Sequence, residues 1–404
     1  MAAKFLRVIT MNKHFFPANI LLPKGNFQKW SVIACDQYTS EPNYWEAVKE
    51  TVQNAPSALN IILPEVYLSK DNSKAVSKIN ENMQKYLNDG VFDEISDTFV
   101  YVERTLKNGQ VRRGIVGLID LNDYSYIKGE KALIRATEAT VLERIPPRVE
   151  IRRDAPIEMP HIMLLIDDIN KTVIEPLSEK CEKFEKLYDF SLMQDSGSIK
   201  GFAVKGEEAE NISLSLEKLI ENTEDKMLFA VGDGNHSLAT AKECYAINKT
   251  ENSRYALVEI VNIHDESLQF EPIYRVIFNV NPENLINDFV EKTGGEYNGA
   301  DAQKFTCIYG DTVREISIKP TGKLAVATLQ KYLDENPQGE TDYIHGEDVV
   351  YKLCKAENTV GFIFSGMQKD ELFDAVKQDG ALPRKTFSMG HAEDKRFYLE
   401  ARKL

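Results

Sequence analysis

Cysteine and histidine are scarce in this chain, and neither is spaced as a disulfide or metal framework requires. The five cysteines are odd in number, lie far apart and form no Cys-X-X-Cys pair: Cys35, Cys181, Cys244, Cys307 and Cys354. No two of the six histidines are four residues apart, as a helical zinc site needs. We therefore expect no disulfide scaffold and no zinc, haem or flavin. Cys35, beside Asp36, is the thiol to test for reactivity.

Long apolar runs, internal repeats and low-complexity linkers are also missing. The longest mostly apolar stretches, residues 257–263 and 162–166, are far shorter than the roughly 20 residues that a membrane helix needs. The first residues lack the apolar core of a signal peptide. We therefore expect a cytoplasmic protein that has no membrane partner.

Positive charge is in deficit. The chain has 49 Lys and Arg against 63 Asp and Glu, a net charge of −14, which repels a nucleic-acid backbone. No nucleic-acid partner is expected. With 404 residues, of which 43% are hydrophobic, the chain is long enough for two or three domains or subdomains, as in a soluble metabolic enzyme.

Strand and helix patterns alternate along the chain, which predicts a mixed α/β fold. Expected strands and helices in the first half are strands at 31–35, 99–105, 111–119 and 201–204, and helices at 44–54, 171–187 and 212–222. A strand ending at Val231, a helix to about Ala246 and a strand over 255–263 then follow in the order of a βαβ unit. After Asn279, a helix over 282–293 and further alternation predict a C-terminal α/β portion.

The most informative segment lies where the strand ending at Val231 meets the next helix. Its residues are Gly232, Asp233, Gly234, Asn235, His236 and Ser237. Glycines permit positive φ and a close ligand, and the first amides of a helix attract anions. The pattern predicts a phosphate site in which Asp233 caps the helix or binds Mg²⁺ and His236 transfers protons. The alternative is a turn that uses Gly and Asp for geometry alone.

The same residues resemble a known helix start. Gly232-Asp233-Gly234-Asn235-His236, followed by Ala239 and Ala241, is similar to the Asp-Gly-X-His-Arg motif of the ParB/sulfiredoxin fold. That fold includes CTP-using ParB proteins, ATP-using sulfiredoxins and free serine kinases, so the resemblance implies a nucleotide phosphate. Ser237 stands where the motif has Arg, so the guanidinium contact to phosphate is either absent or supplied from elsewhere.

A second resemblance covers nearly the whole chain. Its segments are Val32-Ile-Ala-Cys-Asp-Gln-Tyr-Thr-Ser-Glu-Pro-Asn-Tyr-Trp45, Pro147-Arg-Val-Glu-Ile-Arg-Arg153, Glu158-Met-Pro-His-Ile-Met163, the Asp-Gly-Asn-His turn and Leu382-Pro-Arg-Lys-Thr-Phe-Ser-Met-Gly-His391. They are similar to the bacterial domain-of-unknown-function 1015 family, which has no settled activity. Gene order in that family implies serine or phosphoserine. The two resemblances predict a ParB/sulfiredoxin-like phosphate-binding region over 1–280 and a C-terminal α/β subdomain over 281–404 that completes the cleft.

Basic residues offer candidate phosphate ligands elsewhere in the chain. Pro146 and Pro147 are expected to break a helix and leave three arginines on an extended segment: Arg148, Arg152 and Arg153. Arginine binds phosphate through two parallel hydrogen bonds, so these three are predicted phosphate ligands, and Lys385 is a further candidate. The alternative for each is a structural ion pair, which we favour for Arg135 and Arg144.

Two acidic residues in the N-terminal part are candidate proton acceptors. Phosphorylation of a hydroxyl such as that of serine needs a carboxylate within hydrogen-bond reach. Asp36 and Glu41 follow a predicted strand, and the resemblance to free serine kinases points first to Glu41. The alternative is that Ser40, Glu41 and Pro42 only begin the helix that contains Trp45.

These patterns leave three hypotheses for function. The first is a phosphotransfer enzyme, kinase-like or phosphatase-like, that acts on a small phosphorylated metabolite such as phosphoserine, with Mg²⁺ and ATP or ADP as expected cofactors. The second is a nucleotide- or phosphate-binding regulatory protein without turnover. The third, an assembly protein, has little support beyond the helices.

Overall fold

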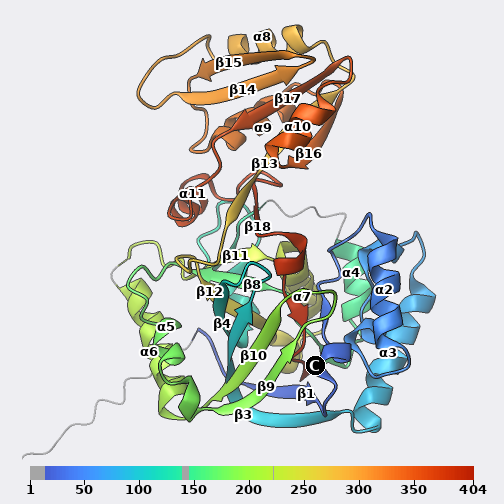
Figure 1. Cartoon of the computed structure of the whole chain (residues 1–404). Coiled ribbons are helices and arrows are strands. Elements are labelled where there is room, and N and C mark those ends of the chain that lie inside the picture. Colours follow the sequence, from blue (N-terminus) through green and yellow to red (C-terminus); the bar gives the residue numbers. More distant parts are fainter. Residues whose placement is uncertain (1–13, 139–144, 222) are drawn as a thin grey trace, which may run out of the picture.

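The chain folds into two lobes, one above the other in Figure 1, each built on a β-sheet with helices packed against it. This computed structural model describes residues 14–138, 145–221 and 223–404. The mixed α/β class expected from the sequence is confirmed.

The large lobe contains a ten-stranded mixed sheet. Its strands run in the order β5-β6-β11-β8-β12-β4-β3-β10-β9, and β1 also pairs with β3. Their bounds are β1 (Ala18–Pro23), β3 (Phe92–Thr105), β4 (Val111–Asp120), β5 (Tyr124–Ser125), β6 (Ile134–Ala136), β8 (Met163–Ile166), β9 (Glu185–Ser191), β10 (Ser198–Val204), β11 (Phe229–Asp233) and β12 (Tyr255–Asn262). Central strands β8 and β12 are almost wholly buried because helices and loops cover both faces of the sheet.

The large lobe has two hydrophobic cores, each formed between the sheet and its own set of helices. One core packs α5 (Glu175–Ser178), α6 (Glu207–Glu221) and α7 (Asn235–Ile247) against the sheet. The other lies beneath α1 (Phe27–Trp30), α2 (Pro42–Val52) and α3 (Ser73–Asn88), and contains the buried Trp30 and Trp45. α4 (Ile145–Arg152) packs beside α7. The start of α7 therefore lies among elements from several parts of the chain.

The small lobe has a six-stranded sheet in the order β15-β14-β17-β13-β16, with β18 also paired to β13. Its elements are β13 (Phe270–Phe278), α8 (Pro282–Lys292), β14 (Gln303–Tyr309), β15 (Thr312–Ile318), α9 (Ala325–Glu335), β16 (Glu340–His345), α10 (Glu347–Leu353), β17 (Thr359–Phe364), α11 (Glu371–Asp379) and β18 (Phe387–Met389). A core around Phe289, Phe305 and Phe362 holds these elements together.

After α11 the chain returns to the large lobe, as the red ribbon of Figure 1 shows. Tail strand β19 (Phe397–Tyr398) pairs with β2 (Val32–Ile33), and β20 (Arg402–Lys403) pairs with β7 (Ile157–Glu158). The boundary between the two lobes therefore differs from the boundary at residue 280 that the sequence predicted, for two reasons. β13 is a strand of the small-lobe sheet although it precedes that boundary, and the tail beyond β18 pairs with the large lobe.

Local sequence signals predicted several elements well. The hairpin of β3 and β4 turns at Asn108-Gly109, where Gly109 has φ +85°, and α2, α6 and α8 lie close to their expected ranges. The helix expected over 171–187 is wrong. It shrinks to the four residues of α5, and the segment from Glu185 instead forms β9 at the edge of the sheet. There Tyr188 is buried and Phe190 half-buried, so packing overrides local propensity.

Two further expectations need correction. The strand–helix–strand order at 229–262 is present, but β8 lies between β11 and β12, antiparallel to β11 and parallel to β12. The two strands are therefore not the adjacent parallel pair of a simple βαβ unit. The segment after the prolines at 146 and 147 is not extended, because both prolines, Arg148 and Arg152 lie within α4. Whether the prolines end a preceding helix lies outside the described residues.

The two residues of β20 make one buried and one exposed ion pair with the large lobe, which suggests a matched test. Buried Glu158 contacts Arg402 and Arg152, whereas Glu94 pairs with the exposed Lys403 at 2.6 Å. Burial alone would raise the pKa of Glu158, but the charges of Arg152 and Arg402 outweigh it and lower that pKa. The carboxylate's contribution to stability is therefore present at neutral pH and is lost as the pH falls through its lowered pKa.

We predict that Glu158→Gln lowers the free energy of unfolding by about 3 kcal/mol at pH 7, because Arg402 is left buried without its counter-charge. Glu94→Gln, the control, should cost less than about 1 kcal/mol. Urea denaturation should also show the gap between wild type and Glu158→Gln narrowing below about pH 4. Equal effects of the two substitutions would contradict this account of the tail.

Candidate functional site

The turn between β11 and α7 uses its two glycines for different reasons. Gly234 is the N-cap of α7 with φ +83°, and a Cβ there would lie 3.1 Å from the Cα of Ile162. Gly232 lies in β11 and does not have positive φ, contrary to expectation. A Cβ at 232 would lie 2.8 Å and 2.9 Å from side-chain atoms of Leu165 and Met389. Backbone conformation requires glycine at 234, and close packing requires it at 232.

The start of α7 has no side-chain cap. Asp233 instead accepts a hydrogen bond at Oδ1 from its neighbour Gly234 N–H, at 2.9 Å, so the expected capping role is wrong. The first bond within the helix runs from Leu238 N–H to Gly234 O. The backbone amides before Leu238 in the first turn of α7, such as those of Asn235 and Ser237, have no acceptor within the helix and lie at its positive end.

The side chain of Asn235 fixes this helix start to the end of β6. Its Nδ2 donates to Thr137 Oγ1 at 3.3 Å, and its Oδ1 accepts from Thr137 N–H at 3.2 Å. Thr137 Oγ1 in turn donates to Val231 O at 2.6 Å. The side chain of Asn235 therefore stabilises the turn. Its role as a phosphate ligand stays a prediction, and the group that remains available for it is the backbone amide.

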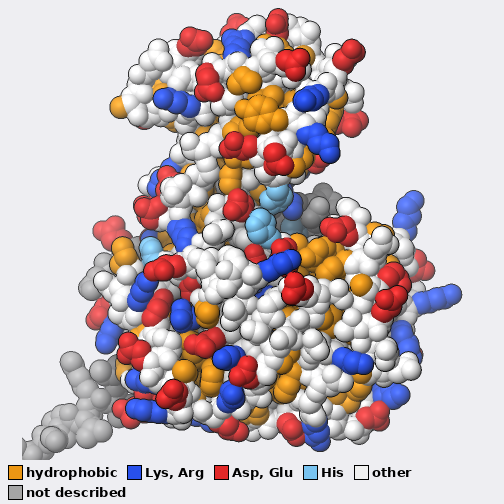
Figure 2. All heavy atoms as spheres, viewed as in Figure 1, with side chains coloured by type: hydrophobic (Ala, Val, Ile, Leu, Met, Phe, Trp, Pro, Cys, Tyr) orange, Lys and Arg blue, Asp and Glu red, His pale blue; other side chains and the backbone are white. Residues whose placement is uncertain are grey.

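A cavity of about 430 Å³ opens at this turn, between the large lobe and residues of the small lobe and tail. Figure 2 shows the surface narrowing between the lobes, with histidine side chains at this waist. The predicted residues that line the cavity are Asp36, Arg148, Gly232, Asp233, Gly234, Asn235, His236, Ser237 and Lys385. The structure thus brings together residues that lie far apart in the sequence.

Three predicted residues lie elsewhere. Glu41 is exposed just before α2 and does not line the cavity. Arg152 pairs with buried Glu158, Arg153 pairs with Asp154, and both line a different cavity. Of the three predicted arginines, only Arg148 lines the site. Arg152 lies one turn further along α4, and Arg153 follows the end of that helix.

Two of the three Lys and Arg side chains that line the cavity come from the segment after α11. Lys395, which is 8% exposed, places its Nζ 3.3 Å from Asp233 Oδ2. Lys385 also lines the cavity, and its backbone, at φ +55°, is held by a hydrogen bond from Arg275 to its carbonyl. Arg148 contacts Glu65 at the same cavity. Three cationic side chains thus line the cavity, and two of them, Lys395 and Arg148, are paired with carboxylates.

Two carboxyl groups of the cavity titrate in opposite directions. Burial raises the pKa of Glu138, and the nearby charge of Lys385 offsets this only in part. Burial also acts to raise the pKa of Asp36, but the charge of His161 and a hydrogen bond from Gln37 outweigh it and lower that pKa. The surroundings therefore shift the pKa of Glu138 upward and that of Asp36 downward, and opposed shifts of this kind are typical of acid–base sites.

Two histidines also face the cavity. His161 accepts or donates at Nδ1 with the hydroxyl of Tyr398, 2.8 Å away. His345, at the end of β16, has a lowered pKa because of burial and then the charges of Lys385 and Lys395. His345 is therefore neutral at pH 7.

Several lining residues had no assigned role in the sequence analysis: Glu138, His161, His345 and Lys395. Lys395 and His345 come from segments more than 100 residues beyond the turn, and the pairing of β19 with β2 fixes the position of Lys395. The basic composition of the tail was the only available signal for Lys395.

Candidate metal ligands are sparse. No group of three or more His, Cys, Asp or Glu side chains within the described ranges is arranged to hold a metal ion. The predicted Mg²⁺ ligand Asp233 is already close to Lys395 and Gly234 N–H, so Mg²⁺ here would depend mainly on ligand phosphates and water. Over the same described ranges, no helix is both long and apolar enough to cross a membrane.

These features define a two-lobed mixed α/β protein with a polar cavity at a helix N-terminus. The chain matches the family model described as "Protein of unknown function (DUF1015)" over residues 17–338, and it therefore belongs to that family. No curated protein matches the chain.

Among solved structures, the chain is similar to a free serine kinase in complex with AMP, at 14% identity and a TM-score of 0.39, covering 70% of this chain and 90% of that one. It is also similar to a conserved hypothetical protein from Pyrococcus furiosus, at 13% identity and a TM-score of 0.36, covering 71% and 94%. A third is C-terminally truncated SbnI from Staphylococcus aureus, at 10% identity and a TM-score of 0.38, covering 68% and 82%. Similarity this weak carries no inference about function.

We predict that Gly234→Ala both destabilises the protein and weakens phosphate binding. Alanine at φ +83° costs about 1–2 kcal/mol, and its Cβ crowds Ile162 and displaces the turn. Gly206→Ala is the matched control, because Gly206 has φ +60° with no atom within 4 Å of an added Cβ. The midpoint temperature of thermal unfolding should fall in both variants. Phosphate affinity measured by equilibrium dialysis should fall only in Gly234→Ala. Unchanged affinity in Gly234→Ala would remove the turn from the site.

Cys35 is predicted to be an unreactive thiol. Burial, followed by the charge of Asp36, raises its pKa to about 12, so little thiolate exists near neutral pH. With iodoacetamide at pH 8, Cys35 should react at least roughly a hundred times more slowly than a free cysteine. Mass spectrometry should find half-buried Cys181 alkylated first. Rapid alkylation of Cys35 would contradict the raised pKa.

Proposed function

We propose that the cavity binds the phosphate of a small metabolite or a nucleotide and that the protein transfers a phosphoryl group. The observation that carries this proposal is the convergence in one cavity of the α7 start, Lys385, Lys395 and two carboxyl groups of opposed pKa. A volume of about 430 Å³ also falls within the range of small-molecule sites, roughly 300–1,000 Å³.

Phosphate binding draws on the main chain first. Amides at the start of α7 point to the cavity end of the helix, where the dipole favours an anion. Lys385 and Lys395 then neutralise the charge that builds up on the transferred group. Ser237 adds a hydroxyl in the place where the resembling motif has Arg, and Arg148 supplies a guanidinium from α4.

Proton transfer falls to the acids and to His236. Glu138, whose pKa is raised by burial, is a stronger base than an ordinary carboxylate and is suited to take the proton of an acceptor hydroxyl. Asp36, with its lowered pKa, stays ionised and orients the acceptor, and it replaces Glu41 as the N-terminal carboxylate of the site. His236, in the first turn of α7, is the second group for proton transfer.

A bound ATP or ADP would supply the phosphoryl group, and serine is the proposed acceptor, since the family resemblance points to serine or phosphoserine. Release of phosphate from phosphoserine to water is the close variant. A regulatory protein that binds nucleotide without turnover is the second candidate, because Ser237 lacks the phosphate-binding charge of Arg.

The test is a direct assay of purified protein with ATP or ADP plus serine, and with phosphoserine alone, with and without Mg²⁺. We expect phosphoserine or free phosphate as product. His236→Ala should lower kcat by about 10²-fold or more with unchanged thermal unfolding, and Glu138→Gln should do likewise. Lys395→Gln should chiefly raise the KM for the phosphorylated ligand.

Lys74→Gln, an exposed lysine at the start of α3, is the control and should leave all constants unchanged. Nucleotide binding without any product would favour the regulatory candidate. Neither binding nor product in any combination would overturn the phosphoryl-transfer proposal.

A further inference from the structure

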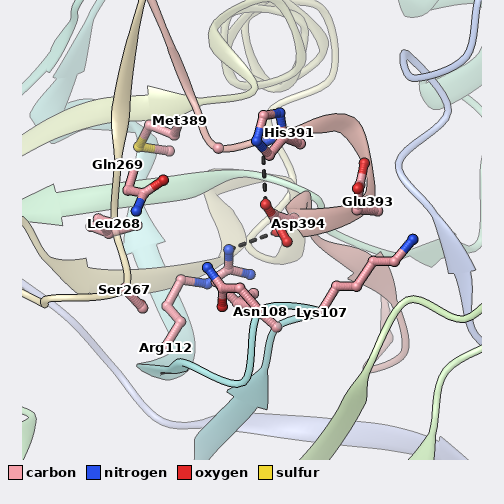
Figure 3. Close-up of a pocket in the computed structure, with 12 residues that line it drawn as sticks. Lys107, Asn108, Arg112, Ser267, Leu268, Gln269, Met389, His391, Glu393 and Asp394 are labelled. Atoms are coloured by element: carbon pink, nitrogen blue, oxygen red, sulfur yellow. Dashed lines mark hydrogen bonds between the residues drawn. The ribbon is translucent and has the colours of Figure 1, made fainter.

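A second cavity, of about 250 Å³, lies on the other side of the tail loop that contributes Lys395. Its walls are the turn of the β3–β4 hairpin, the segment before β13 and the loop over residues 389–394. Figure 3 shows the guanidinium of Arg112 on one side of this space, with Gln269, His391 and Lys107 around it. None of the predicted site residues lines it.

Two buried arginines beside this cavity have no carboxylate partner. Arg104 is 2% exposed and Arg112 is 4% exposed, and neither belongs to an ion pair within the part of the chain that is described. Arg104 donates to the carbonyls of Ser196 and Glu393, and Arg112 Nη1 donates to the carbonyl of Asp394 at 2.7 Å. The Nε atoms of both arginines are buried without a hydrogen-bond partner.

Unpaired buried charge of this kind is costly, because desolvation is not repaid by a counter-ion. At Arg104, burial and then the charge of Arg112 disfavour the charged guanidinium and lower its pKa to about 9. Asp394 offers partial compensation to Arg104, but its Oδ2 already accepts from His391 N–H at 3.2 Å. Arg112 lines the cavity, so an anion there would meet the uncompensated charge.

The charged side chains that line the cavity, histidine left out, are two cations and two carboxylates: Lys107, Arg112, Glu393 and Asp394. The remaining lining includes the apolar Leu268 and Met389. An anion is therefore favoured by the position of the buried Arg112 guanidinium and not by an excess of positive charge. A small space with one buried guanidinium, an apolar floor and amide groups suits a small organic anion rather than a polyanion.

We propose that this cavity is a second binding site, for a small organic anion whose carboxylate or phosphate pairs with Arg112, and that its occupancy controls the first cavity. This inference goes beyond the proposed phosphoryl transfer.

The loop that separates the two cavities provides the coupling. Met389 lines both cavities. Gly390 N–H donates to Gln269 O, next to β13, and the turn over Ala392–Asp394 leads directly to Lys395. Because Arg104 and Arg112 hold the carbonyls of this turn, an anion on Arg112 fixes the loop and with it the Lys395 ammonium beside Asp233. Two sites that bias one segment are coupled reciprocally.

The test measures binding of inorganic phosphate by equilibrium dialysis, with acetate as a competing carboxylate. Wild type should show two classes of phosphate site. Arg112→Gln and Lys107→Glu should each weaken one class by roughly tenfold, and Lys395→Gln should weaken the other. Lys107 is exposed on the hairpin turn, so Lys107→Glu remains informative if Arg112→Gln fails to fold. Lys74→Glu, remote from both cavities, is the matched charge-reversal control and should change neither class.

The outcomes separate the two proposals. Displacement of the Arg112-dependent class by acetate identifies a carboxylate site, and resistance to acetate identifies a phosphate site. Binding to the Lys395-dependent class should change when the second class is filled, and this change should vanish in Lys107→Glu. A single class of site lost in Lys395→Gln, or a second class indifferent to residues 107 and 112, overturns the inference. Absence of phosphoryl transfer alone does not, because dialysis needs no turnover.

Discussion

The buried ion pairs of the C-terminal tail are the constraint on which the candidate site depends. Arg396 lies between Glu259 of β12, at 2.9 Å, and Glu400, at 2.8 Å, and all three side chains are at most 4% exposed. Such a cluster has few alternative arrangements, because any displacement leaves a charge buried and unpaired. Lys395 is the residue before Arg396, and Tyr398 follows two residues after it. The cluster therefore fixes the lysine beside Asp233 and the hydroxyl beside His161.

Sequence reasoning succeeded where the structure follows from neighbouring residues. The turn at Gly234, the hairpin at Gly109 and the helix that begins at Pro42 each depend on backbone preferences that a few residues determine. It failed where the structure depends on distant packing. The segment from Glu185 becomes a strand because β10 pairs with it, and no local signal reveals that partner.

The candidate site divides in the same way. The glycine turn at the start of α7 was predictable, because strand, glycines and helix start are contiguous. Glu138, His345 and Lys395 reach the cavity only because β6, the small-lobe sheet and the tail converge on it. Conversely, Arg152 and Arg153 were proposed from composition, but Arg152 pairs with the buried Glu158, Arg153 pairs with Asp154, and both line a different cavity. Spacing along the chain identifies a local motif but not its distant partners.

The pair formed by Lys395 and Asp233 links the static structure to function. Both side chains face the cavity at its anion-binding end, and the separation of 3.3 Å lets each neutralise the other while no ligand is bound. A phosphate at the start of α7 brings negative charge toward Asp233, so Lys395 gains by turning to the ligand and Asp233 loses its partner. Binding therefore includes the exchange of one ion pair for another. The affinity of the proposed phosphate site would depend on how firmly the tail loop holds Lys395, and the proposed second site at Arg112 lies against the same loop.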